Sequence, residues 1–290
     1  MGVTTLPMPH VEGVDVAHRF ATVDGVRLHY AEAGEGEPLV LLHGWPQHWW
    51  AWRELIGPLS EHHRVIAPDI RGFGWSEAPR DDYRFSRIAD DLFGLLDALG
   101  IERTRLVGHD WGLGAGYVAC LARPERIERF VALGGPHIWA TEGAPPRLFL
   151  RPWHIYVNAS PLGELATARL GVPAICLRTW RHRGAFTPEE IEIYTSPLRR
   201  PGSARATRLR YRTFVVRELS RFARDRPRLR TKTLHVNGAQ DPLTIGTPGS
   251  WRRYADDMRY ETLDDCGHFL AEEQPQELLD RITGFLRPPA

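Results

Sequence analysis

Five residues of the chain, GHDWG at 108–112, have the types and spacing that best suit chemistry. The apolar run TRLV precedes them, and the run LGAGYVA, which suits a helix, follows them. Glycines two positions before and two positions after a central residue allow a strained strand-to-helix turn without Cβ clashes. Asp110 stands at the centre of this turn, where a carboxylate can attack an alkyl carbon and form a covalent ester. On these residues alone an ordinary helix N-cap is the better interpretation of Asp110, so the rest of the chain has to decide.

Two further residues that could do chemistry follow predicted strands, as Asp110 does. Asp241 comes shortly after the run TLHVNG at 233–238, and His268 comes after the run YETL at 260–263. In open α/β sheets, sites form beyond the carboxyl ends of the parallel strands. Asp, Asp and His in this chain order match the nucleophile, acid and base of one class of hydrolases. Each residue alone is a common turn or loop residue, but three of them at three strand ends predict a catalytic site.

The sequence HGWP at 43–46 follows another continuous apolar run, at 38–42. The backbone N–H groups of Trp45 and Trp111 are predicted to form an oxyanion site, because such groups can stabilise a negative oxygen beside the nucleophile. His43 is a candidate for the substrate site, although we favour a buried histidine that shapes this loop through hydrogen bonds.

The elements that must position these residues alternate between strand and helix. A hairpin is predicted at 18–31 with Asp24 and Gly25 in its turn, and an amphipathic helix is predicted at 85–99. Further strands are predicted at 38–42, 64–68, 129–133 and 233–238. This alternation predicts an α/β fold, with a mostly parallel central sheet flanked by helices.

The alternation stops in the middle of the chain. Between 137 and 228 no convincing strand is visible, and helices are predicted at 188–194 and 204–219. We therefore expect an α/β core, formed by residues 1–136 and 229–290, that is interrupted by an inserted helical cap at 137–228.

Composition limits the class of protein. The chain has 290 residues, a net charge of +1 and 42% hydrophobic residues, which suits a globular protein. No apolar run is long enough for a membrane span, and the first 16 residues do not resemble a signal peptide. The three cysteines are widely spaced and form no metal-ligand or disulfide pattern. We expect a cytoplasmic protein that holds no metal and has no membrane partner.

Charge is unevenly distributed along the chain. Residues 137–228 contain 17 arginines and 7 acidic residues, a net charge of +10, and the remainder carries −9. A basic face can bind nucleic acid. Here the arginines are irregularly spaced and no nucleic-acid motif accompanies them, so we expect a basic cap on an acidic core and no nucleic-acid partner.

Taken together, these motifs resemble those of α/β-hydrolases of the epoxide hydrolase branch, and they are also similar to those of haloalkane dehalogenases. The matching segments cover nearly the whole chain except the cap: HGWPQHWWAWREL (43–55), DIRGFGWS (69–76), GHDWG (108–112), VNGAQDP (236–242) and GHF (267–269). The resemblance implies an α/β-hydrolase fold without a cofactor, in which Asp110 is the nucleophile, His268 the base and Asp241 its orienting acid. It also implies a cis peptide bond between Trp45 and Pro46.

The cap residues decide which leaving group the enzyme handles. By resemblance, epoxide hydrolases donate protons from two cap tyrosines, whereas dehalogenases bind the halide with N–H donors. Tyr211 stands where the second cap tyrosine is expected, and we take it as catalytic. Alignment places Trp153 at the first tyrosine's position, with Tyr156 one helical turn away, and we take both as candidate substrate-binding residues.

We predict an enzyme that hydrolyses epoxides to vicinal diols through a covalent ester on Asp110. One alternative is a haloalkane dehalogenase with Trp111 and Trp153 as halide donors. Another is a noncatalytic small-molecule receptor on the same fold, against which the intact set of Asp110, Asp241 and His268 argues. The tryptophans of segment 43–55 favour a small apolar or aromatic substrate. The sequence leaves the oligomeric state open between a monomer and a homodimer, and it does not identify the natural substrate.

Overall fold

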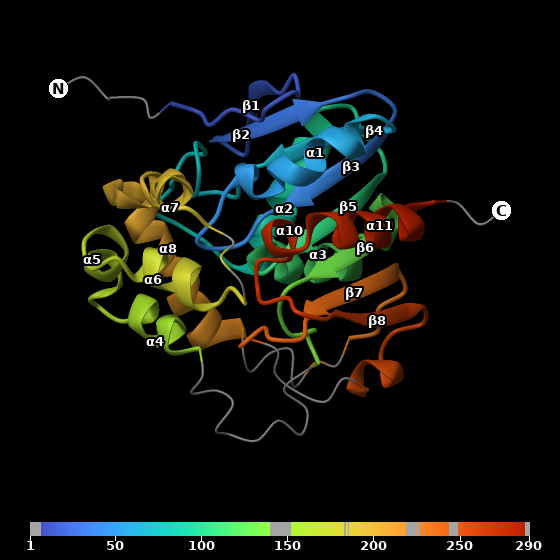
Figure 1. Cartoon of the computed structure of the whole chain (residues 1–290). Coiled ribbons are helices and arrows are strands. Elements are labelled where there is room, and N and C mark those ends of the chain that lie inside the picture. The colour runs from blue at the N-terminus through green and yellow to red at the C-terminus, as the bar shows by residue number, and fades with distance from the viewer. Residues whose placement is uncertain are drawn as a thin grey trace.

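Eight strands form a sheet in the order β1-β2-β4-β3-β5-β6-β7-β8 in the computed structural model of the protein (Figure 1). The structure describes residues 7–139, 152–182, 184, 186–218, 225, 227–243 and 249–287. The β1–β2 and β2–β4 pairs are antiparallel, and the other neighbouring strands are parallel, as predicted. The strands are β1 (Ala17–Val23), β2 (Val26–Ala33), β3 (Glu37–Leu42), β4 (His63–Pro68), β5 (Thr104–His109), β6 (Ile127–Leu133), β7 (Lys232–Gly238) and β8 (Met258–Leu263).

β5, the strand that leads to Asp110, lies in the middle of this sheet. All six residues of β5 are buried, because β5 is covered by parallel neighbours on both sides and by helices on its faces. At the edge, the predicted hairpin is confirmed by the antiparallel register of β1 and β2. Its turn residues Asp24 and Gly25 have φ angles of 46° and 78°, which is the backbone that a two-residue hairpin turn requires.

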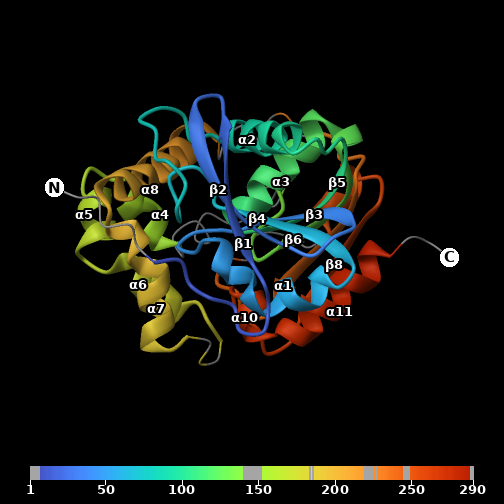
Figure 2. The ribbon, with the colours of Figure 1, turned by 90° about the horizontal axis from the view of Figure 1, so that it is seen from above.

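Helices cover both faces of the sheet (Figure 2). α2 and α3 pack together on one face, and α1 and α11 lie on the other. The helix predicted at 85–99 is therefore confirmed as α2. The helices of the core and its short 3-10 turns are α1 (Arg53–Ser60), α2 (Phe85–Ala98), α3 (Trp111–Ala122), α10 (Leu270–Glu273), α11 (Pro275–Leu286), η1 (Trp49–Trp52), η2 (Pro124–Arg126) and η6 (Ser250–Arg253).

Between β6 and β7 the described residues form helices and no strand, and we call these helices the cap. They lie together at one end of the sheet (Figures 1 and 2). The helix predicted at 188–194 is confirmed, and a capping box between Thr187 and Glu190 starts it. The cap elements are α4 (Trp153–Ala159), α5 (Gly163–Ala168), α6 (Val172–Thr179), α7 (Pro188–Thr195), η4 (Pro197–Arg199) and α8 (Pro201–Thr213).

The end of the last cap helix differs from the prediction of one continuous helix at 204–219. α8 ends at Thr213 and continues as a π-helical turn, Phe214–Glu218. Within this turn the buried Glu218 carboxylate lies 2.7 Å from the guanidinium of the buried Arg210 and accepts a hydrogen bond from the backbone N–H of Phe85, at 2.6 Å. The π-helical turn thus accompanies a buried ion pair that links the cap to the start of α2. Periodicity in the sequence cannot predict such a contact, because its partners lie far apart in the chain.

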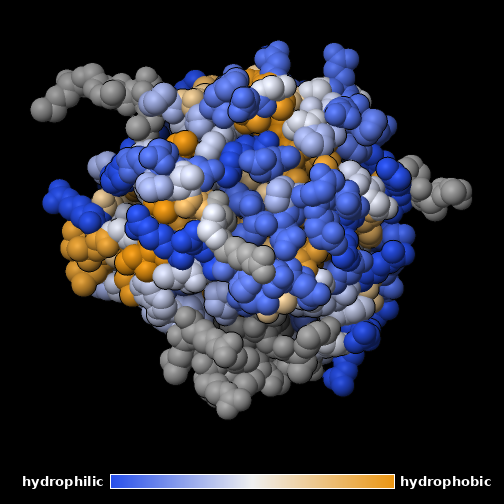
Figure 3. All heavy atoms as spheres, in the orientation of Figure 1, coloured by the Kyte–Doolittle hydropathy of each residue, from blue (hydrophilic) through white to orange (hydrophobic). Residues whose placement is uncertain are grey.

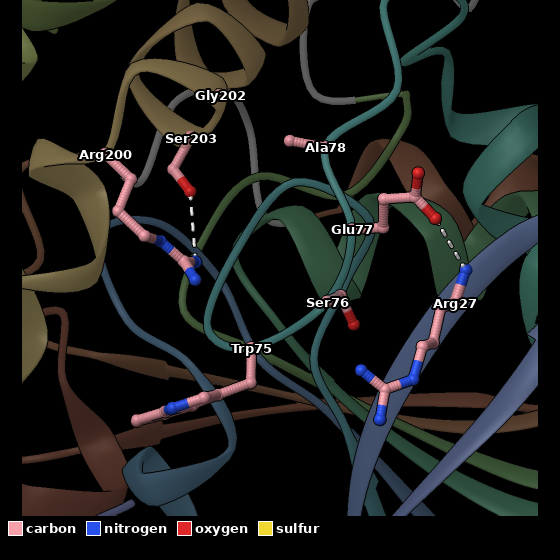
Figure 4. A pocket seen from close by; sticks show the side chains of 8 residues that line it. All are labelled: Arg27, Trp75, Ser76, Glu77, Ala78, Arg200, Gly202 and Ser203. Carbon is pink, nitrogen blue, oxygen red and sulfur yellow. Dashed lines mark hydrogen bonds between the residues drawn. The ribbon is translucent and has the colours of Figure 1, made fainter. Parts of the chain in front are cut away.

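The seam between cap and core also carries a surface groove of about 490 Å³ (Figure 4). Residues 75–78 of the core and the start of α8 form its walls, and Arg27 of β2 lies at its rim. Arg200 crosses the seam, because its guanidinium donates to the backbone carbonyl of Gly74 and to the hydroxyl of Ser203. Asp110, Asp241 and His268 do not line this groove. Throughout the described part of the chain, the helices are too short or too polar to cross a membrane. The face of the molecule in Figure 3 is mostly hydrophilic, apart from a hydrophobic area over the cap.

Candidate active site

The backbone at Asp110 is strained in the way that the glycine spacing predicts. Asp110 links β5 to α3 with φ of 50° and ψ of −108°, a conformation that costs energy for a residue with a side chain. A Cβ on Gly108 would lie 2.4 Å from the carbonyl oxygen of Gly112, and a Cβ on Gly112 would lie 2.1 Å from that of Leu42. Glycine is therefore needed at both positions to bring β3, β5 and α3 this close together.

The turn that follows β3 approaches the carboxylate of Asp110. The backbone N–H of Trp45 donates to Oδ2 of Asp110 at 2.8 Å, and the backbone N–H of Trp111 also bonds this carboxylate. The peptide bond between Trp45 and Pro46 is cis, as predicted. Gly44 has no room for a side chain, because its Cβ would lie 2.3 Å from Cβ of Asp110. Two N–H groups thus hold the carboxylate of Asp110, and the N–H of Trp45 does so at Oδ2.

The surroundings of Asp110 make it a weaker acid than usual. Burial raises its pKa to about 6, although His268 and the two backbone N–H groups act in the opposite direction. A carboxylate with this pKa is ionised at neutral pH and is more nucleophilic than one with a low pKa.

His268 and Asp241 lie in contact beyond the carboxyl ends of β8 and β7, at the sheet edge where Asp110 follows β5. Nδ1 of His268 lies 3.1 Å from Oδ2 of Asp241, and both side chains are buried. Oδ1 of Asp241 accepts from the backbone N–H of Leu243 at 2.8 Å, which fixes the carboxylate. Burial lowers the pKa of His268, but the Asp241 carboxylate and the charge of Asp110 outweigh it, so the pKa lies above the ordinary value. Nε2 of His268 is buried and has no hydrogen-bond partner among the described residues, which suits a base that awaits a water.

The backbone of His268 is bound on two sides. Its carbonyl oxygen accepts from Nε2 of His109 at 2.8 Å, and its N–H donates to the carbonyl of Trp180 in the cap at 3.0 Å. Burial lowers the pKa of His109 well below its usual value, so His109 is a neutral donor and not a second base. The residue before the nucleophile therefore positions the predicted base.

Tyr211, a buried residue of α8, lies over the turn at residues 43–47, which we call the oxyanion turn. Its side chain is 1% exposed, and its ring makes edge contacts with Trp45, at a centroid distance of 5.3 Å, and with Trp111, at 4.9 Å. Burial raises the pKa of its hydroxyl well above the usual value and nearby Asp110 raises it further, whereas the Trp111 and Asn158 side chains lower it. Tyr211 is therefore a protonated donor close to the charge of Asp110.

His154 is a site residue that sequence reasoning missed. Its ring stacks on Trp45 at a centroid distance of 5.7 Å and an angle of 12°, and it contacts Tyr211 at 5.5 Å. It is 2% exposed, its Nδ1 has no partner among the described residues, and burial lowers its pKa well below the usual value. A neutral imidazole in this position can donate one hydrogen bond without carrying a charge. The available signal was helical spacing, because His154 and Asn158 are the buried polar residues of α4 and lie four positions apart.

The two other cap candidates lie on the opposite side of α4. Trp153 is 39% exposed and Tyr156 is 42% exposed, whereas His154 is 2% exposed and its ring contacts those of Trp45 and Tyr211. His154 is therefore the residue of this helix that lies against Trp45 and Tyr211. Neighbouring positions on a helix differ in direction by about 100°, so the residue next to Trp153 faces a different side.

His43 also needs correction as a substrate-binding candidate. Its Nδ1 lies 3.0 Å from the carbonyl oxygen of Gly44, and its Nε2 accepts from the backbone N–H of Ile70 at 2.9 Å. Both ring nitrogens are thus used to hold the loop, which is the alternative that we favoured. Of the tryptophans at 45–52, Trp45 is the one that reaches Tyr211 and His154, while Trp49 and Trp50 pack against His18 and Tyr194.

The described residues contain no group of three or more His, Cys, Asp or Glu side chains arranged to hold a metal ion. The charged groups of the site are Asp110, Asp241 and His268. Arg210 lies nearby, but its guanidinium stacks on the outer face of the Trp111 ring, 4.5 Å from the centroid, and pairs with Glu218. The arrangement can therefore supply a carboxylate nucleophile, a histidine base and two neutral cap donors.

Comparison with known proteins gives consistent matches. A family model described as the alpha/beta hydrolase fold matches residues 37–275. A soluble epoxide hydrolase from a Corynebacterium species is 31% identical over 284 residues, which cover 94% of this chain and 98% of that protein. A Mus musculus protein named epoxide hydrolase 4 is 28% identical over 280 residues, 91% of this chain and 77% of that protein. The solved structure of the epoxide hydrolase CorEH has a TM-score of 0.83 and 30% identity, and covers 93% of this chain and 98% of its own.

Proposed function

The chain belongs to the α/β-hydrolases, in their epoxide hydrolase branch, and on that premise we propose that it opens epoxides to vicinal diols through a covalent ester on Asp110. The observation that carries the proposal is the meeting of Tyr211 and His154 over Trp45, whose N–H is bonded to the nucleophile. An epoxide oxygen leaves as a basic alkoxide, so it needs hydrogen-bond donors opposite the attacking carboxylate.

In the first step, Oδ1 of Asp110 attacks one epoxide carbon, because Oδ2 is held by the N–H of Trp45. The carbon–oxygen bond of the epoxide breaks and an alkyl ester forms. Tyr211 transfers its proton to the developing alkoxide, and His154 donates a hydrogen bond to the same oxygen. The raised pKa of Tyr211 keeps this proton in place at neutral pH until the alkoxide forms.

In the second step, Nε2 of His268 takes a proton from a water, and the resulting hydroxide attacks the ester carbon. The negative charge that develops on Oδ2 is stabilised by the N–H groups of Trp45 and Trp111. The bond between that carbon and the alkyl oxygen breaks, and the diol leaves with a proton from His268. The carboxyl group of Asp110 then loses its proton, which returns through water to Tyr211 and restores the starting enzyme. Asp241 holds Nδ1 of His268 so that the imidazole keeps the required orientation.

We propose a neutral, apolar or aromatic epoxide as the substrate. Aromatic side chains lie around Asp110, and the guanidinium of Arg210, which stacks on the Trp111 ring, is paired with Glu218. A carboxylate or phosphate on the substrate would therefore lack a partner. We also propose residues 137–228 as the cap unit and a cytoplasmic, cofactor-free protein, for which the three free and buried cysteines are the supporting observation.

Trapping the ester tests this function. His268→Gln should still be alkylated but should hydrolyse the ester slowly, because only the second step needs an activated water. Mass spectrometry after incubation with styrene oxide should show protein plus one substrate mass, located on Asp110. If the variant binds styrene oxide and forms no adduct, the covalent mechanism and the role of His268 are both wrong.

Dehalogenation is a second candidate, because Nε1 of Trp111 and Nδ2 of Asn158 are buried N–H donors that interact with the Tyr211 side chain. Both lie beside Tyr211, and two N–H donors are what a departing halide needs. A halide-release assay with 1-bromobutane and 1-chlorobutane, run beside the epoxide assay, decides between the two. Halide release without diol formation would favour the dehalogenase.

A further inference from the structure

α10 is a single helical turn that begins two residues after His268 and ends with Glu272 and Glu273. It packs against η1 and α1, on the side of the sheet that faces α7 of the cap (Figure 2). The two glutamates reach different parts of the site, and each of them also bonds the cap.

The carboxylate of Glu273 holds the loop that carries His268, residues 264–269, which we call the base loop. Its Oε2 accepts from the backbone N–H of Gly267 at 2.8 Å, and its Oε1 accepts from the backbone N–H of Phe269 at 3.0 Å. The N–H groups on both sides of His268 therefore bind one side chain. Oε2 also accepts from the backbone N–H of His182, at 2.7 Å, which belongs to the cap segment between α6 and α7.

The cap segment and the base loop lie so close together that Gly267 could not carry a side chain. A Cβ on Gly267 would lie 2.6 Å from the carbonyl oxygen of Trp180 and 2.8 Å from Oε1 of Glu273. The same Trp180 carbonyl accepts from the N–H of His268. The Trp180 ring makes edge contacts with the rings of His268, at 5.7 Å, and His154, at 4.0 Å. Cap and base loop are thus bonded to each other directly and through Glu273.

The neighbouring Glu272 makes an equivalent connection to the other half of the site. Its side chain is 1% exposed and accepts from Nε2 of Gln47 at 2.6 Å and from the hydroxyl of the cap residue Tyr194 at 2.5 Å. Gln47 closes the turn that contains Trp45, because its N–H bonds the carbonyl of Gly44 at 3.0 Å. α10 therefore links the cap to the base loop at one residue and to the oxyanion turn at the other.

We propose that Glu273 is a positioning residue that couples the seating of the cap to the orientation of His268, and so controls the hydrolytic half of the reaction. This inference rests on the proposed function. Alkylation uses Asp110, whose carboxylate is held by the N–H groups of Trp45 and Trp111 and is not bonded by Glu273. Hydrolysis uses His268, whose loop Glu273 holds on both sides.

Single-turnover kinetics of Glu273→Gln with styrene oxide tests the proposal. A glutamine replaces one acceptor oxygen with an NH2 group, which would face a backbone N–H and break at least one of the three bonds. Alkylation should stay within about twofold of wild type, while ester hydrolysis should slow by about tenfold to a hundredfold, the range for small misplacements of a catalytic group. The alkyl-enzyme should then accumulate. The acid limb of hydrolysis should also move to lower pH, because the charge of Glu273 helps to raise the pKa of His268.

Glu277→Gln is the matched control, since Glu277 lies on the exposed side of α11 and pairs with Arg281. It should leave both steps unchanged. If Glu273→Gln hydrolyses the ester at the wild-type rate, or slows both steps equally, Glu273 is only structural and the proposal is overturned. If Glu273→Gln does not fold, Glu273→Asp, which keeps the charge but reaches fewer N–H groups, should show the same selective slowing. Absence of an adduct in wild type and in His268→Gln would instead reject the proposed function itself.

Discussion

At the scale of single residues, the two oxygens of Asp110 are not equivalent. Oδ2 is bonded to the N–H of Trp45, so Oδ1 is the oxygen that should attack and leave with the product. The strained backbone at Asp110 holds this arrangement before substrate arrives. The position of an oxygen label therefore reports the mechanism directly.

Asp110→Asn should abolish turnover of an epoxide and leave the fold intact, because it removes the charge and changes little volume. In the wild type, one turnover in heavy-oxygen water should place the label in Asp110, since water attacks the ester carbon. Peptide mass spectrometry of the enzyme and analysis of the diol measure both sites. Label in the diol alone after one turnover would mean that water attacks the epoxide directly.

Tyr211 and Trp153 make a matched pair, because one is 1% exposed over Trp45 and the other is 39% exposed on the outer side of α4. Tyr211→Phe should lower kcat on an epoxide by about 10²- to 10⁴-fold, the usual contribution of general acid catalysis. Trp153→Phe should have little effect. A loss with Trp153→Phe that matches or exceeds the loss with Tyr211→Phe would contradict the assignment of the proton donor.

At the scale of elements, the buried pair of Arg210 and Glu218 fastens the cap to the core. Its side chains are 0% and 8% exposed, and the guanidinium stacks on Phe85 and Trp111. Glu218→Gln should lower the free energy of unfolding by about 3 kcal/mol, because it leaves the buried Arg210 charge without an opposite charge. Glu164→Gln, which breaks the more exposed pair with Arg208, should cost less than about 1 kcal/mol. Urea unfolding of both variants measures the difference, and equal costs would show that the buried pair does not hold the seam.

The sequence predicts the elements of the core better than those of the cap, and the reason is periodicity. β3 and β5 are predicted from their apolar runs. Asp110, Asp241 and His268 are predicted as site residues because each follows a predicted strand. The π-helical turn at 214–218 and the placing of His154 depend on contacts between segments far apart in the chain. Trp153 and Tyr156 are candidates by resemblance alone, and both are exposed, whereas the ring nitrogens of His43 are used within its own loop, as the favoured alternative expects. Glu273 could not be assigned at all from sequence, because its partners are backbone N–H groups.

At the scale of the whole molecule, cap and core together bury the site and so shift the pKa values of its groups. Burial raises the pKa of Asp110 to about 6, and the Asp241 and Asp110 carboxylates raise that of His268 above its ordinary value. Ester formation removes the charge of Asp110. The pKa of His268 should therefore fall once the ester exists, which frees the base for the step in which it is needed.

The pH dependence of the two steps should show this coupling. Asp110 must be ionised to attack, so the alkylation rate should rise with pH through about 6 and then level off. His268 must be neutral to activate water, so hydrolysis also falls at low pH, and its limb should lie below the titration of His268 in the free enzyme. NMR titration of the imidazole in wild type and in Asp110→Asn, together with stopped-flow rates at each pH, measures both effects. The variant carries no charge at position 110, so the pKa of His268 should be lower in it than in wild type. An unchanged pKa in the variant would mean that Asp110 and His268 titrate independently and that the ester does not prepare the base.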